Sequence, residues 1–248
     1  MDRFFVPAEA LKSKEVELNK ELSHRLRHVL RLREGDRVIL VDGRGGEFEA
    51  ELEDVSSPIV RARTLGKSAG LAEPKAHVVL YQSIIKGDRF DWVLEKGTEL
   101  GVSKFVPLVS RRGIIRPRSE RFERKERWER IITEAAVQCG RSFLPELSPA
   151  VEMDEALAQA TGLLLLPWEG EHELSLRHVL RETLAGGEKT PVISIFIGPE
   201  GGFARQEVDR ALEGGVKTVS LGERILRSET AGIVASAAVL YELGELGD

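Results

Sequence analysis

The chain contains 248 residues, of which 42% are hydrophobic and 31% charged, and its formal net charge is −5. This length accommodates one large domain or two modest ones. Because the overall charge is negative, any binding of nucleic acid has to come from local basic patches. The single cysteine, Cys139, excludes an internal disulfide framework. The first residues lack an apolar signal core, and the longest apolar run, Leu163–Trp168, is too short for a bilayer. We therefore expect a soluble, cytoplasmic protein with no membrane partner.

The first third of the chain is typical of a small β domain. A short strand is expected at Arg3–Val6 and a helix at Asn19–Arg31. Further strands, separated by turn residues, are expected at Asp36–Asp42, Gly46–Asp54 and Ile59–Leu65. Several short strands at this spacing favour a small sheet or barrel. The segment Gly66–Pro74 is small, polar and closed by proline, so we place a domain boundary there, after residues 1–70.

From residue 74 to residue 248 the pattern alternates between strands and helices. Strands are expected at His77–Gln82, Lys104–Val109, Gly162–Pro167, Val192–Ile197 and Thr218–Leu221. Helices are expected at Arg89–Leu100, Arg121–Gln138, Met153–Ala160, Leu174–Leu184 and Arg205–Glu213, with a last one from about Arg227–Thr230 to Leu243. This alternation predicts an α/β domain with a parallel sheet covered on both faces.

Two of these strands end in glycine-rich loops. Gly198–Gly202 follows the strand Val192–Ile197, and Gly222 follows Thr218–Leu221. In a parallel sheet, the carboxyl ends of strands are where ligands bind, although either loop alone could be an ordinary turn. Neither loop carries the P-loop or dinucleotide spacing. The segment after His77–Gln82 also lacks the glycine fingerprint of an oxidoreductase. The pattern therefore favours a nucleoside-like ligand without a long phosphate tail.

Two segments are locally basic. Arg25, Arg27 and Arg31 interleave with the apolar positions of the first helix, where they either bind RNA or form a solvated face. Arg111, Arg112 and Arg116 are predicted to lie on a loop, from which guanidinium groups can reach phosphates at several angles. Both groups are candidate RNA-binding residues.

Several motifs resemble one family of the SPOUT superfamily. IGPEGGF at Ile197–Phe203 and LGERILRSETA at Leu221–Ala231 are similar to its two signature loops, and KGDRFDWVLEKGTELGV at Lys86–Val102 to another of its segments. RFFV at Arg3–Val6 and HRLRHVLRLREGD at His24–Asp36 resemble its PUA-like domain. The family methylates N3 of a uridine in 16S ribosomal RNA of the small subunit.

The resemblance implies S-adenosylmethionine (AdoMet) as cofactor, a trefoil knot in residues 74–248, a PUA-like RNA-binding domain in residues 1–70, and a homodimer. It places cofactor contacts at Leu166, Pro167, Trp168, Gly198, Pro199, Gly201, Gly202, Leu221, Gly222, Ile225, Leu226 and Thr230. Arg3, Glu200 and Arg227 are the implied catalytic candidates, although Glu200 can equally stabilise its own turn. No metal is expected.

The general base and the exact target nucleotide stay open at this point. So do two alternative functions. One is ribose 2′-O methylation, or another reaction of the same superfamily. The other is a ribosome assembly factor that binds RNA without catalysis.

Overall fold

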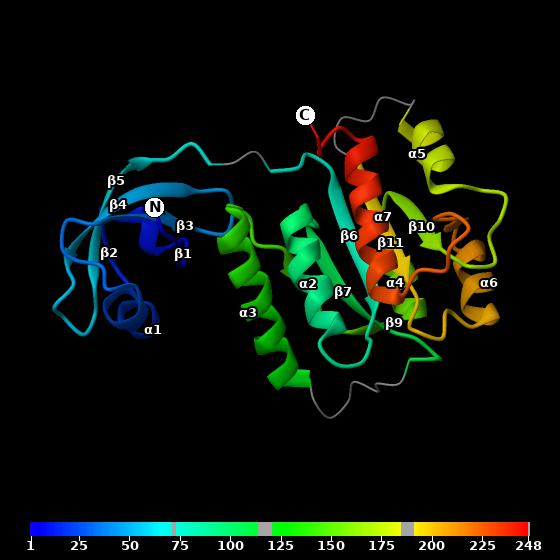
Figure 1. The fold of residues 1–248 in the computed structure, drawn as a ribbon, viewed down its shortest axis with the longest axis horizontal. Helices are drawn as coiled ribbons and strands as arrows, with labels where there is room; N and C mark the ends of the chain where they lie inside the picture. The colour runs from blue at the N-terminus through cyan, green and yellow to red at the C-terminus, as the bar shows by residue number, and fades with distance from the viewer. Residues whose placement is uncertain (71–72, 114–120, 185–190, 248) are drawn as a thin grey trace. The chain divides into compact units, whose positions relative to one another are not determined.

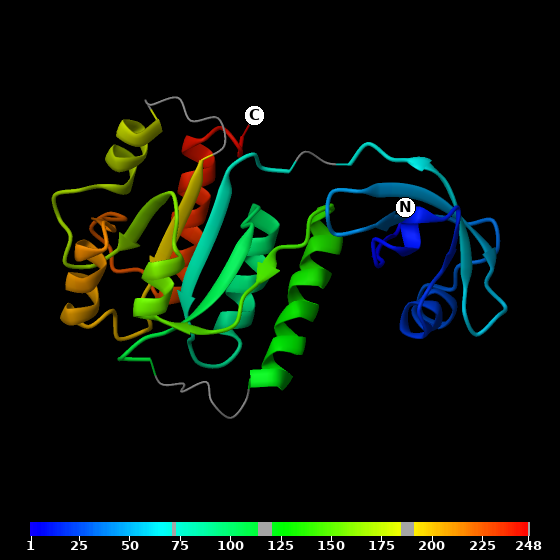
Figure 2. The same ribbon diagram turned by 180° about the vertical axis from the view of Figure 1, so that it is seen from behind.

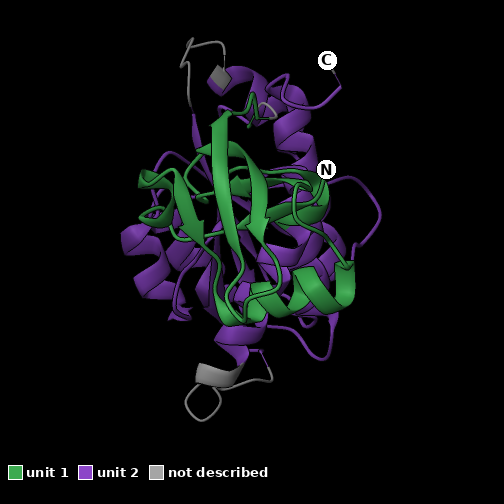
Figure 3. Ribbon diagram, turned by 90° about the vertical axis from the view of Figure 1, so that its left-hand side faces the viewer, with its two compact units in different colours: residues 1–73, 136–144 green, residues 74–135, 145–248 purple. Residues whose placement is uncertain are grey.

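The computed structural model describes residues 1–70, 73–113, 121–184 and 191–247. The chain divides into two compact units, coloured separately in Figure 3. The first comprises residues 1–73 and 136–144, and the second comprises residues 74–135 and 145–248. The sequence did not indicate that residues 136–144 belong with the N-terminal unit.

The first unit is built on a curled five-stranded sheet (Figure 1). Its strands are β1 (Arg3–Phe5), β2 (Glu15–Glu17), β3 (Arg37–Val41), β4 (Glu47–Asp54) and β5 (Arg61–Lys67), in the order β1-β3-β4-β5-β2. The pair β1–β3 is parallel and the other pairs are antiparallel. Side chains alternate along β4: Ala50 and Leu52 are buried in the core, whereas Glu49 and Glu51 form ion pairs on the other face.

The helical part of this unit is short and irregular. It contains a 3-10 turn η1 (Ala10–Lys12), the helix α1 (Lys20–His24) and a π-helical segment η2 (Arg25–Leu30). The chain leaves η2 at Arg31, whose φ of 55° lies in the left-handed region. Leu26 is fully buried against the sheet, so the basic residues around it are directed away from the core.

The second unit contains a parallel sheet of strands β6 (His77–Ser83), β7 (Lys104–Val109), β8 (Glu146–Leu147), β10 (Leu163–Pro167), β11 (Val192–Ile197) and β12 (Lys217–Val219). Their order is β12-β10-β11-β6-β7-β8, and a short strand β9 (Val151–Glu152) also pairs with β7. Every pairing is parallel. The helices are α2 (Arg89–Leu100), α3 (Arg121–Cys139), α4 (Met153–Gln159), α5 (Leu176–Leu184), α6 (Arg205–Glu213) and α7 (Ser228–Glu242). The predicted α/β architecture is confirmed.

Helices cover both faces of this sheet, as Figures 1 and 2 show from opposite sides. On β6, Val78 and Leu80 pack into one core with side chains of α2, α3, α5 and α7. Tyr81 faces the other way, into a second core with side chains of α4 and α6. Successive residues of a strand point to opposite faces, so burial on both sides explains why these strands are nearly continuous apolar runs.

The helix α7 runs across the centre of the first face, against α2, α5, β6 and β11. Ala235, Val239 and Leu240 are buried, whereas Val234 and Tyr241 are exposed. In α2, Gly97 is pressed against the sheet: a Cβ there would lie 2.7 Å from the ring of Phe105. That close approach accounts for a glycine inside a helix, where its intrinsic cost is about 1 kcal/mol relative to alanine. Among the helices in the described ranges, none has the length and apolar character needed to cross a membrane.

Candidate active site

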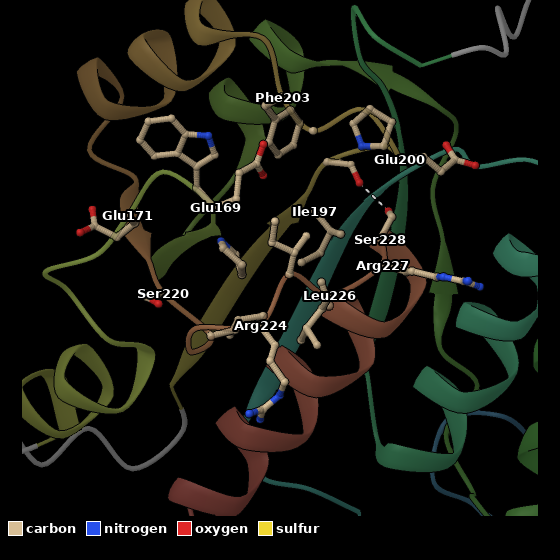
Figure 4. Close-up of a pocket in the computed structure, with 18 of the residues that line it drawn as sticks. Glu169, Glu171, Ile197, Glu200, Phe203, Ser220, Arg224, Leu226, Arg227 and Ser228 are labelled. Atoms are coloured by element: carbon tan, nitrogen blue, oxygen red, sulfur yellow. Dashed lines mark hydrogen bonds between the residues drawn. The ribbon is translucent and has the colours of Figure 1, made fainter.

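The loops that follow the strands of the second unit meet at one edge of its sheet, because parallel strands share the position of their carboxyl ends. A cavity of about 640 Å³ lies there (Figure 4). Its walls come from the loops after β10, β11 and β12 and from the first turn of α7. The two glycine-rich loops identified in the sequence therefore face a common space.

Most of the predicted cofactor residues line this cavity. They are Pro167, Trp168, Gly198, Pro199, Gly201, Gly202, Leu221, Gly222, Ile225 and Leu226. Leu166 is fully buried within β10 instead, and Thr230 lines a neighbouring cavity. Ligands of small-molecule sites typically fill about 300–1,000 Å³, so this space suits a nucleoside-sized molecule.

The loop after β11 is a tight turn fixed by backbone geometry. The N–H of Gly202 donates to the carbonyl oxygen of Pro199 at 2.9 Å, and Gly202 has a φ of 66°. A Cβ at Gly202 would also lie 2.7 Å from Oε1 of Glu169. Glycine at this position is required both by the left-handed conformation and by the approach of the neighbouring loop.

A hydrogen-bond chain ties this loop to the beginning of α7. Nε2 of Gln82, on β6, donates to the hydroxyl of Ser228 at 2.9 Å. That hydroxyl in turn donates to the carbonyl oxygen of Gly198, as the dashed line in Figure 4 shows. Gln82 and Ser228 are both buried. The position of the first glycine-rich loop is therefore coupled to the start of α7 through Ser228, a residue that the sequence alone did not single out.

The loop after β10 is stabilised by Glu171. Its carboxylate accepts a 2.6 Å hydrogen bond from Oγ1 of Thr218 and bonds of 2.9 and 3.0 Å from the N–H groups of Glu173 and Leu174. The hydrogen bond from Thr218, followed by those from the backbone, holds the pKa of Glu171 below its ordinary value. Because the carboxylate of Glu171 is bonded both to the backbone of its own loop and to Thr218 on β12, its role at the cavity is to hold the loop against that strand.

The cavity carries charges of both signs. Carboxylates come from Glu169, Glu171, Glu200 and Glu223, and cations from Arg89, Arg224 and Arg227. The guanidinium of Arg205 lies 5.2 Å from the ring centroid of Trp168, which fixes one wall. A ligand with a positive centre and a carboxylate, joined to an uncharged ring system, would be complementary to this lining.

Two of the predicted catalytic residues lie at the cavity. Oε1 of Glu200 accepts a 3.2 Å hydrogen bond from the N–H of Lys86 and is 3.1 Å from Nη2 of Arg89. In Figure 4 the side chains of Glu200 and Arg227 extend to the same side, away from Ile197. Arg3 belongs to the first unit, where it forms bonds of 2.7 and 3.1 Å with the carboxylate of Glu47.

The predicted RNA-binding residues differ in the contacts that they make with the rest of the protein. Nη1 of Arg112 donates to the carbonyl oxygen of Gly201 at 3.0 Å, so this arginine lies against the first glycine-rich loop. Arg111 is anchored on α6 through its N–H to Glu207 at 2.9 Å and its side chain to Gln206. Arg116 lies outside the described residues.

In the first unit, Arg25 and Arg31 are exposed. Arg27 is half-buried and donates to the carbonyl oxygens of Ser23 and Pro58, each at 3.4 Å. The two exposed arginines are therefore the members of the first basic group that are most open to an RNA ligand.

Comparison with known proteins first defines the class. A family model described as an RNA methyltransferase domain matches residues 72–240, and one described as an RNA methyltransferase PUA domain matches residues 18–65. The chain is thus an RNA methyltransferase with an attached PUA domain.

The relatives narrow this class. The ribosomal RNA small subunit methyltransferase E of Bacillus subtilis is 30% identical over 98% of this chain and 97% of its own length. That of Synechocystis is 32% identical over 96% of this chain and 76% of its own length. The chain belongs to the family of ribosomal RNA small subunit methyltransferase E.

Solved structures agree with this assignment. The enzyme of the same family from Neisseria gonorrhoeae, determined bound to S-adenosyl methionine, has 32% identity and a TM-score of 0.83, with 97% of each chain covered. A methyltransferase from Legionella pneumophila, determined in complex with the bound cofactor SAM, has 30% identity and a TM-score of 0.81, with 96% of each chain covered.

Proposed function

We propose that this protein transfers a methyl group from AdoMet to N3 of a uridine in 16S ribosomal RNA of the small subunit. The observation that carries the proposal is the cavity at the carboxyl edge of the sheet, which both glycine-rich loops line and where Ser228, at the start of α7, bonds to the first of them. The family membership and the cofactor bound by the Neisseria gonorrhoeae relative support it. The substrate, a ribosomal subunit, places the proposed activity in the cytoplasm.

The cavity fits AdoMet in size and charge. Backbone groups of the loops Gly198–Gly202 and Leu221–Leu226 would hold the adenosine and methionine parts, and the carboxylates at the lining would favour the sulfonium. When bound, AdoMet supplies an electrophilic methyl group. The chain's own residues have to orient the cofactor, exclude water and prepare the acceptor nitrogen.

The acceptor sets a further requirement. N3 of uracil is an imide nitrogen and a poor nucleophile while it keeps its proton, so the protein must remove the proton or stabilise the resulting anion. Arg227 is suited to the second task because it lies at the border of the cofactor cavity. Glu200 is already paired with Arg89, so we assign it to positioning that arginine rather than to proton transfer.

We further propose that the second unit is knotted. The strand β12 lies at one end of the sheet, beyond β10, whereas the helix that follows it packs on β11 and β6. Residues 220–227 therefore return past the loop after β11, as a trefoil path requires. A crystal structure in which the backbone path contains no knot would refute this proposal.

A homodimer is the expected assembly. Ile225, in the loop before α7, is 86% exposed, and Val234 and Tyr241, seven residues apart on α7, are 40% and 68% exposed. Burial of such side chains is a common source of subunit association. Light scattering should give twice the mass of one chain, and Val234→Glu with Tyr241→Glu should give a monomer. A wild-type monomer at micromolar concentration would refute the dimer.

The decisive experiment is incubation with tritiated-methyl AdoMet and small ribosomal subunits that lack the modification, followed by nucleoside analysis. Label in N3-methyluridine is the expected result. Label in a ribose-methylated nucleoside would leave the fold assignment unchanged and would show that the reaction is 2′-O methylation. Absence of label, with AdoMet bound in calorimetry, would favour an RNA-binding assembly factor without catalysis.

A further inference from the structure

A second cavity, of about 670 Å³, adjoins the cofactor cavity in the same unit. Arg89 and Arg227 line both cavities. The second is also lined by Lys86, Trp92, Glu229 and Thr230. The two cavities therefore share a border at these arginines, and a molecule in the second would lie next to the cofactor, as transfer between two bound molecules requires.

Glu229 is the unusual member of this lining. It is only 8% exposed, and its Oε2 atom is buried without a hydrogen-bond partner among the described residues. A buried acceptor left unpaired destabilises the folded state, because it loses its hydrogen bonds to water without replacing them. Such a group is retained most readily where a ligand supplies the missing donor.

The other side chains suit a nucleobase. The indole of Trp92 is 41% exposed although tryptophan is usually well covered, so it offers an open aromatic surface. Lys86 and Arg227 line the same cavity and bring positive charge to it, as does Arg89, which also pairs with Glu200. The carboxylate of Asp88, at the same cavity, is 3.2 Å from Nη2 of Arg127 and is therefore already paired.

We propose that the second cavity holds the target uracil, with its ring against Trp92 and its N3–H directed at the carboxylate of Glu229, which acts as the general base. This inference rests on the proposed function and supplies the base that the sequence left unassigned. The hydrogen-bond pattern is complementary: uracil presents one imide donor between two carbonyl oxygens, which the nearby cations can bind.

The proton step balances as follows. The N3–H bond breaks, its electron pair stays on N3, and the proton forms an O–H bond on Glu229, from which it passes to water. The N3 pair then forms the bond to the methyl carbon while the carbon–sulfur bond breaks and its electrons remain on sulfur. Cytosine has no proton at N3, so its lone pair would face the carboxylate and be repelled.

Glu229 also lies in the first turn of α7, where an acidic side chain stabilises a helix through its interaction with the helix dipole. That role predicts different behaviour. A helix-stabilising carboxylate affects the melting temperature and leaves the dependence of the methylation rate on pH unchanged. A general base affects both the rate and its pH dependence.

The test uses Glu229→Gln with small ribosomal subunits that lack the modification. We expect kcat to fall about 10²-fold or more, with AdoMet affinity within about twofold of wild type. The residual rate should rise about tenfold per pH unit, since hydroxide then removes the proton. Glu213→Gln, on the exposed end of α6, is the matched control and should keep the wild-type rate.

A Glu229→Gln protein with the wild-type rate and pH profile would overturn the inference while leaving the proposed function intact. Failure of the wild-type protein to form N3-methyluridine would instead refute the proposed function.

A second variant keeps the inference testable if Glu229→Gln does not fold. Trp92 is partly exposed, so Trp92→Ala should fold, and it should raise KM for the subunits about tenfold through lost stacking, with a smaller change in kcat. An unchanged KM would show that the uracil does not bind in this cavity.

Discussion

The hydroxyl of Ser228 donates a hydrogen bond to the carbonyl oxygen of Gly198, a residue 30 positions earlier in the chain. The same hydroxyl accepts a hydrogen bond from Gln82 on the central strand β6. Through these contacts one buried side chain fixes the first turn of α7 against the loop after β11. The width of the cofactor cavity depends on this arrangement, because both segments line it.

Ser228→Ala should therefore affect both folding and ligand binding. It leaves the carbonyl of Gly198 without the hydroxyl donor and leaves Nε2 of Gln82 only its bond to the carbonyl of Ser83, so we expect the free energy of unfolding to fall by about 1–3 kcal/mol. AdoMet affinity should weaken about tenfold, as urea unfolding and calorimetry can measure. Ser236→Ala on the same helix is the control: its buried hydroxyl has no partner within the described chain, so its loss should be nearly neutral. Equal effects of the two variants would contradict the coupling.

Gly201→Val tests the first glycine-rich loop. A Cβ at Gly201 would come no closer than 3.7 Å to Arg112, so the fold has room for the new side chain. The added methyl groups should instead occupy the cavity and weaken AdoMet binding about 10- to 100-fold in calorimetry. Gly66→Val, in β5 with nothing within 4 Å of its Cβ position, should bind AdoMet normally. If Gly201→Val binds AdoMet with the wild-type affinity, this loop does not form part of the cofactor site.

The free energy of unfolding should depend on pH in part through the ionisation of Glu47. Burial opposes the ionisation of this carboxyl, but hydrogen bonds from Arg3 and Ser142 and the charge of Arg3 outweigh it and hold its pKa below the ordinary 4.5. A lowered pKa in the folded state contributes stability above pH 4.5 that is lost as the pH falls through the folded value.

Glu47→Gln should accordingly be less stable than wild type at pH 7, and the difference should shrink as the pH falls below 4.5. Urea unfolding at a series of pH values measures this. Glu9→Gln breaks a largely exposed pair with Lys12 and should show almost no difference at any pH. A constant deficit of Glu47→Gln across the acidic range would show that the ion pair with Arg3 does not determine it.

Charge neutralisation should locate the RNA contacts of the first unit. If Arg25 and Arg31 contact phosphates, Arg25→Gln with Arg31→Gln should reduce the slope of log affinity against log salt by about 1.4–1.8. Filter binding of 16S ribosomal RNA at several salt concentrations measures this slope. Arg61→Gln with Arg63→Gln removes the same charge from side chains already paired with carboxylates and should leave it unchanged. Identical slopes for both pairs would assign Arg25 and Arg31 to a solvated face.

Much of the fold follows from local patterns. The helices α2 and α6 begin and end where the sequence predicted, because each joins an amphipathic repeat to polar or glycine termini. The strands β10 and β11 were predicted from apolar runs typical of burial on both faces. The strand β2 was missed: it has only three residues, two of them glutamates, and its pairing with β5 supplies the stability that its composition does not.

The lining of the candidate site could be predicted where it consists of glycine-rich backbone, and less so where it consists of side chains that meet only through the fold. Gly198 and Gly222 are conspicuous in the sequence and line the cavity. The pairing of Arg3 with Glu47, 44 residues away, leaves no local trace. Glu229 resembles any acid in a first helical turn, and only its burial distinguishes it.

The first turn of α7 serves both cavities. Ser228 and Ala231 line the cofactor cavity, and Glu229 and Thr230 line the second. Consecutive residues of a helix are rotated by about 100° from one another, so this division is a matter of helical phase. The packing of α7 on α2, α5, β6 and β11 holds this phase, so loss or gain of one residue in the segment 220–227 would have to be absorbed by that loop, most of which lines the cofactor cavity. Natural variation in this stretch should therefore proceed by substitution at constant length, and its length would be a stricter mark of the activity than any single side chain in it.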